Sequence, residues 1–162
     1  MAHEFYVSIE FTKQGKIKGE SLRKDHKDKI TGLSFEYEIQ VPTDAATGHP
    51  SGKRQHKPIV ITKEWGASSP QLFTACAHNE TLKKVLFEFI KAAKDGKEHV
   101  YYTITLENAH VSSYKPYTGR EEGAKHVEAT DTFELEEIEF TFEKIQLDNK
   151  DANTSAYDNW IE

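Results

Sequence analysis

Residues 48–70 read G-H-P-S-G-K-R-Q-H-K-P-I-V-I-T-K-E-W-G-A-S-S-P and join a long polar loop to a strand and a helix start. The β-branched run I-V-I is too short for a helix and is typical of a strand buried on both faces. Ser68 and Ser69 supply hydroxyls for an N-cap, and Pro70 suits the first helical position. No acid pair, metal cluster or nucleophile accompanies the loop, so we expect it to contact another protein.

Strict alternation of apolar and polar residues is the dominant pattern around this stretch. It is clearest in residues 5–11 and 33–41, which predicts half-buried strands. Residues 82–92 fit the spacing of a helix and also the face of a strand. The D-G turn at residues 95–96 is typical of a hairpin, which needs a strand before it, so we interpret residues 82–92 as a strand.

The C-terminal third completes the predicted fold. Residues 133–147 carry apolar positions in two phases, which predicts one long strand with β-bulges. Residues 148–162 resemble a flexible tail. Together with a helix over residues 70–78, these patterns predict one mainly β domain over residues 1–147. We expect a closed antiparallel β-barrel of about eight strands with one flanking α-helix.

Bulk composition limits the classes of function. The chain has 162 residues and a net charge of −6, which disfavours nucleic-acid binding. Cys76 is the single cysteine, so no internal disulfide is expected and the reducing cytosol is the expected folding compartment. We find no classical signal peptide and no apolar span of membrane length, so we expect neither a cleaved leader nor membrane insertion.

Several motifs that could carry chemistry fail on spacing or context. The G-H-P-S-G-K-R segment lacks the spacing of a phosphate-binding loop, and no G-x-S-x-G motif is present. The eight histidines are scattered singly, which gives a metal site little support. We interpret the acidic run as the solvated face of a strand; it comprises Glu134, Glu136, Glu137, Glu139 and Glu143. The sequence therefore predicts no enzyme, no cofactor and no metal.

An ordered series of segments resembles the haemolysin-coregulated protein (Hcp) family, the tube protein of the bacterial type VI secretion system. The segments include K-R-Q-H-K-P-I-V-I-T-K followed by S-S-P-Q-L, then Y-Y-T-I-T-L-E-N-A-H-V and L-E-E-I-E-F-T-F-E-K-I. The resemblance extends over residues 4–147. It implies hexameric rings that stack into a hollow tube, which a contractile sheath expels together with a spike protein, and whose lumen can hold effector proteins. It also implies assembly in the bacterial cytoplasm followed by secretion without a cleaved signal peptide.

The resemblance implies that the loop over residues 43–57 reaches a neighbouring ring or subunit. Because this loop is basic on an acidic chain, we expect it to meet carboxylates of that neighbour. The candidate contact residues are His49, Lys53, Arg54, Gln55, His56 and Lys57. From the residues alone, a monomeric β-barrel that carries an apolar ligand remains an alternative.

Overall fold

The computed structural model describes residues 5–118 and 134–160. Its one α-helix, α1, comprises Ser69–Ala77, and a short 3₁₀ turn, η1, comprises Lys24–His26. The strands are β1 (Phe5–Phe11), β2 (Gly15–Lys16), β3 (Ile30–Gly32), β4 (Ser34–Glu36), β5 (Ile39–Gln40), β6 (Gln55–His56), β7 (Ile59–Glu64), β8 (Leu82–Ala92), β9 (Glu98–Thr118), β10 (Glu134–Thr141), β11 (Lys144–Asn149) and β12 (Thr154–Asn159). The described part of the chain is therefore mainly β with one α-helix, as predicted.

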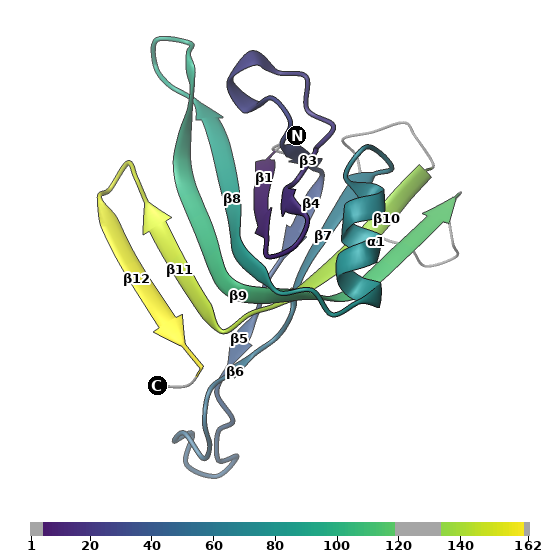
Figure 1. The fold of residues 1–162 in the computed structure, drawn as a ribbon. Helices are drawn as coiled ribbons and strands as arrows, with labels where there is room; N and C mark the ends of the chain where they lie inside the picture. The colour runs from purple at the N-terminus through teal and green to yellow at the C-terminus, as the bar shows by residue number, and fades with distance from the viewer. Residues whose placement is uncertain (1–4, 119–133, 161–162) are drawn as a thin grey trace.

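The long strand β9 organises the sheet. Its first part pairs with β8 on one side and β11 on the other, and its second part pairs with β10. Figure 1 shows β9 bending sharply between these two parts, so that it contributes to both walls of the fold. Asn108, with a positive φ of 49°, lies close to the bend. One strand thus joins the two halves of the sheet.

The expected closed barrel is not confirmed. The paired strands run in the order β2-β1-β8-β9-β10-β7-β4, and the two ends of this path are not paired with each other within the described residues. The segment from β3 to β4 spans the gap between β1 and β7, because β3 pairs with β1 while β4 pairs with β7. The chain changes its pairing partner at Leu33, between β3 and β4, and this change interrupts the hydrogen-bonded ladder. The strands are therefore connected around the fold by the chain, but no single continuous sheet closes into a barrel within the described residues.

Aromatic and aliphatic side chains fill the interior between the two walls. Phe5 stacks on Phe89 at a ring distance of 5.3 Å, and Phe87 meets the edge of Phe140 at 5.9 Å. Alternate residues of β1 point inward, as the period-2 pattern predicts. This interior belongs to one hydrophobic cluster of buried side chains, which leaves the ligand-carrier alternative without support from the described part of the chain.

Three local predictions can be compared directly with the elements. Residues 82–92 form strand β8, and the turn at residues 95–96 connects it to β9, with Gly96 at φ 81°. The prediction of a single strand over residues 33–41 is wrong, since this segment divides into β4 and β5. Residues 134–147 likewise divide into β10 and β11, with one irregularity in register between Glu139 and Phe140, while residue 133 lies outside the described residues.

The segment expected as a flexible tail contains a paired strand. β12 runs antiparallel to β11 along its whole length, from the Lys144–Asn159 pair to the Asn149–Thr154 pair. A turn with Asn153 at φ 55° connects the two strands. The polar composition of this segment is typical of a flexible tail. Polar residues are also typical of an edge strand, whose backbone pairs with a neighbouring strand on one side only. The fold therefore extends past residue 147.

Candidate subunit-contact surface

The polar loop forms an arm that leaves the body of the fold between β5 and β6. We call residues 41–54 the arm; it occupies the bottom of Figure 1, away from the helix. β5 and β6 pair at its base, and Thr43 pairs with Pro50 farther out. Asp44 organises the tip, since its side chain accepts a hydrogen bond from Ala46 N at 2.7 Å and its carbonyl accepts one from Gly48 N at 2.8 Å. The arm is thus an ordered hairpin-like projection.

Four of the six residues predicted to make subunit contacts are exposed to solvent. His49 and Lys53 lie on the arm, and Lys53 forms no ion pair with any residue that the structure describes. Gln55 and Lys57 follow at the base of the arm, where Lys57 pairs with Glu38 at 3.1 Å. Exposed pairs of this kind are weak and exchange partners readily. These four side chains are available to another molecule.

The other two predicted contact residues bind within the chain instead. The Arg54 guanidinium and the His56 ring both reach the same oxygen of Asp158 on β12, the histidine with its Nε2 at 2.6 Å. Arg54 also donates to the carbonyl of Asn159 at 2.7 Å. On its other side, His56 Nδ1 lies 2.6 Å from the hydroxyl of Tyr37. Arg54 and His56 thus both bind Asp158 within the chain.

Aromatic rings bury the histidine of this cluster. The His56 ring lies 4.9 Å from Trp160 and 5.4 Å from Phe142, and its side chain is 1 % exposed. The hydrogen bond from Arg54, followed by that from His56, holds the pKa of Asp158 below its ordinary value. Burial, together with the charge of Asp158, raises the pKa of Tyr37 to about 12. The base of the arm is thus fixed to the C-terminal strand by an ionised carboxylate.

Apolar side chains are exposed next to the arm. Ile39 and Val41, at its base, are 47 % and 45 % exposed, although the alternating pattern places them on the predicted core face. On β12 and just after it, Tyr157 and Trp160 are also exposed. Exposed apolar side chains near a charged projection are typical of a surface that meets another protein. The alternation was thus misleading about burial, but it marks residues suited to an interface.

The predicted helix start is held by side chains rather than by its own cap. Ser68 occupies the N-cap position and Pro70 is the second helical residue, but no side-chain cap bond forms. Instead, Ser68 Oγ donates to Glu20, and Ser69 Oγ donates to Glu136 at 2.8 Å. Both carboxylates also bind the fully buried ammonium of Lys63. This network ties α1 to the sheet and serves the fold.

Glu136 also corrects the interpretation of the acidic run as a solvated face. Its side chain is fully buried and accepts a hydrogen bond from Tyr114 at 2.5 Å. Burial, followed by the hydrogen bond to Glu136, raises the pKa of Tyr114 to about 12. In the described residues, no group of three or more His, Cys, Asp or Glu side chains is placed to hold a metal. Nor does any described helix have the length and apolar character to cross a membrane.

Comparison with known proteins gives a family match over most of the chain. Residues 6–148 match the family described as "Type VI secretion system effector, Hcp". A relative from Pseudomonas aeruginosa described as "Major exported protein" is 33 % identical, and the alignment covers 99 % of this chain and 96 % of the relative. The match thus includes the arm, the helix and most of the described sheet.

Solved structures share the fold across nearly the whole chain. A crystal structure of an Hcp protein has a TM-score of 0.87 at 26 % identity and covers 98 % of this chain and all of that one. A mutant Hcp1 from the E. coli EAEC 042 pathovar has a TM-score of 0.84 at 31 % identity, covering 98 % and 99 % of the two chains. The secreted protein Hcp3 from Pseudomonas aeruginosa has a TM-score of 0.78 at 30 % identity, with the same coverage.

Proposed function

Because the chain belongs to the Hcp family of type VI secretion system effectors, we propose that it is a structural subunit of the secretion tube. Copies of the chain form hexameric rings through one set of heterologous contacts, and the rings stack through another set. The family match over residues 6–148 is the observation that carries this proposal. The role is structural, not enzymatic, and needs no cofactor.

The arm is the part of the chain that we assign to contacts between subunits. It projects from the body of the fold, carries exposed His49 and Lys53, and has exposed Ile39 and Val41 at its base. On a chain of net charge −6, the exposed Lys53 can meet a carboxylate of another copy. Gln55 and Lys57 extend this contact surface along the side of β6, while Arg54 and His56 hold the arm in place.

The remaining partners follow from the same role. The tube assembles in the bacterial cytoplasm, a contractile sheath surrounds and drives it, and a spike protein caps its tip. Effector proteins bind in the lumen of the tube, and the type VI secretion system exports the tube from the cell. The description of the Pseudomonas relative as a "Major exported protein" supports export of this chain. The role requires neither nucleic acid nor insertion into a membrane.

Electron microscopy of the purified chain tests this proposal. Class averages should show rings with sixfold symmetry and an open centre, because closed cyclic assembly repeats one interface around an axis. Single particles of the size of one chain at all concentrations would contradict it. A variant with Val41→Asp and Ile39→Asp is a useful second sample, since loss of rings in that variant alone would assign the apolar base of the arm to the ring contact.

A further inference from the structure

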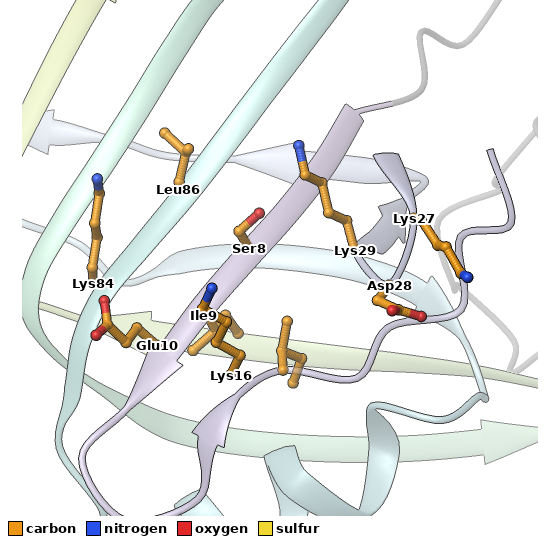
Figure 2. A pocket seen from close by; sticks show the side chains of 10 residues that line it. Ser8, Ile9, Glu10, Lys16, Lys27, Asp28, Lys29, Lys84 and Leu86 are labelled. Carbon is orange, nitrogen blue, oxygen red and sulfur yellow. The ribbon is translucent and has the colours of Figure 1, made fainter. Parts of the chain in front are cut away.

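A pocket of about 410 Å³ lies on the outer face of β1 and β8, apart from the arm. Figure 2 shows Ser8 and Glu10 from β1, Lys84 and Leu86 from β8, and the segment around Lys29 surrounding it. Its apolar lining comes from Leu86, which is half-buried, and from two isoleucines of the core, while charged side chains stand around its rim. A pocket of this volume is in the range that accepts small ligands or a few side chains.

Lysines dominate the charge of this pocket. Lys16, Lys27 and Lys84 line it, all three are exposed, and none forms an ion pair within the part of the chain that the structure describes. The fourth lysine, Lys29, is already bound to Glu88 at 2.6 Å. Two carboxylates, those of Glu10 and Asp28, also belong to the lining and offset part of the positive charge.

The surroundings of the pocket extend its positive charge. The segment that forms β2, η1 and the turn before β3, residues 15–29, holds six Lys or Arg and three Asp or Glu residues, in a chain whose net charge is −6. One of those acids, Glu20, is directed away from the pocket into the buried network with Ser68 and Lys63. This segment thus carries a net charge of +3, six cations minus three anions, and contributes Lys16, Lys27 and Lys29 to the lining of the pocket.

We propose that this pocket binds an acidic peptide segment of a partner protein, with carboxylates on the lysines and an apolar side chain on the floor at Leu86. Lysines spread around a rim suit separate carboxylates, each of which needs only one or two donors. A nucleic-acid backbone fits less well, because its dense charge would meet Glu10 and Asp28, and the pocket offers no arginine fork. This inference goes beyond the tube function and does not depend on ring formation.

Fluorescence anisotropy with a labelled peptide E-E-L-E-E-L-E-E tests the site on the full chain. The peptide should bind, and the charge-reversed pair Lys16→Glu with Lys84→Glu should weaken binding by about tenfold or more, because two attractive contacts become repulsive. The matched control pair is Lys94→Glu with Lys97→Glu, at the exposed turn between β8 and β9. That pair has the same net charge and should leave the affinity within about twofold.

Each other outcome overturns the proposal. Absence of peptide binding, equal losses in the two variant pairs, or equal binding of a peptide with Gln in place of Glu would remove the pocket as a specific acidic-peptide site. Stronger binding of a single-stranded oligonucleotide than of the peptide would identify a nucleic-acid site instead. Circular dichroism checks that each variant is folded. As a second measurement, NMR shifts on peptide addition should concentrate at Ser8 and Leu86, and shifts confined to the arm would reject the site.

Discussion

At the scale of single residues, Asp158 gives the clearest link between the arm and the body of the fold. One carboxylate accepts hydrogen bonds from Arg54 and His56, and the pKa of Asp158 is lowered as a result. Since the folded pKa lies below the ordinary value of 3.8, the carboxylate stabilises the folded state above that value. The stabilisation is lost as the pH falls from about 4 through the lowered pKa.

We therefore predict that Asp158→Asn lowers the melting temperature at neutral pH, and that its difference from the parent shrinks progressively as the pH falls below about 4 through the lowered pKa of Asp158. The reduction should be modest, because the side chain of Asp158 is 34 % exposed. Thermal melts of both proteins across this pH range are the measurement. Asp25→Asn, at an exposed position of η1, is the control and should leave the melting curves unchanged. A loss of stability that does not vary with pH would contradict this account.

Lys63 lies in a buried ion-pair network that we expect to contribute strongly to the stability of the fold. Its ammonium is fully buried and binds Glu136 and Glu20, with the carbonyl of Glu64 at 2.7 Å. Replacing Lys63 by Met leaves two carboxylates near each other without their cation, which should cost about 3–5 kcal/mol of unfolding free energy. Denaturant titration of the variant measures this loss.

A second substitution separates the charge effect from a packing effect. Lys63→Met combined with Glu136→Gln removes one of the uncompensated carboxylates, so part of the lost stability should return. Lys97→Met, on an exposed turn, is the control and should be nearly neutral. An unchanged free energy of unfolding for Lys63→Met alone would contradict this account. It would show that apolar packing at this position stabilises the fold as well as the buried ion-pair network does.

At the scale of elements, the connection from β2 to β3 is held by a close backbone approach at Gly19. A Cβ at this position would lie 2.1 Å from the carbonyl carbon of Lys29, and backbone cannot move aside as a flexible side chain can. Gly19→Ala should therefore cost about 1–3 kcal/mol, seen as a lower melting temperature. Gly52→Ala on the arm is the matched control, because its nearest contact is Pro42 at an ordinary 3.5 Å. Equal melting temperatures for the two variants would show that the connection adapts without cost.

The elements also show how far local pattern determines structure. The strand at residues 82–92 was predictable because the hairpin turn at residues 95–96 requires a strand before it. The exposure of Ile39 and Val41 was not predictable. Alternation tells which face of a strand a residue lies on, but not whether another element covers that face. The strand β12 was missed because its polar residues carry no apolar period, although Trp160 and Asp158 in the D-N-W segment could have suggested an anchored end. The pairing of Arg54 and His56 with Asp158 depends on contacts across more than a hundred residues, which no local pattern contains.

At the scale of the whole molecule, we expect the exposed His49 and Lys53 of the arm to control stacking of rings. Lys53→Glu, alone or with His49→Glu, should shorten tubes while single rings persist, because it reverses the charge of the exposed arm and leaves the Asp158 contacts intact. Tube lengths in electron micrographs are the measurement. Lys94→Glu is the control and should give tubes of parental length. Unchanged tube length in the arm variants would remove the arm from the stacking contact.

Native mass spectrometry of the purified chain tests the central claim most directly, because it counts subunits without depending on tube growth. The account predicts a dominant species of six times the 18.5 kDa chain mass near physiological ionic strength. A spectrum that contains only the 18.5 kDa species at every concentration would contradict it.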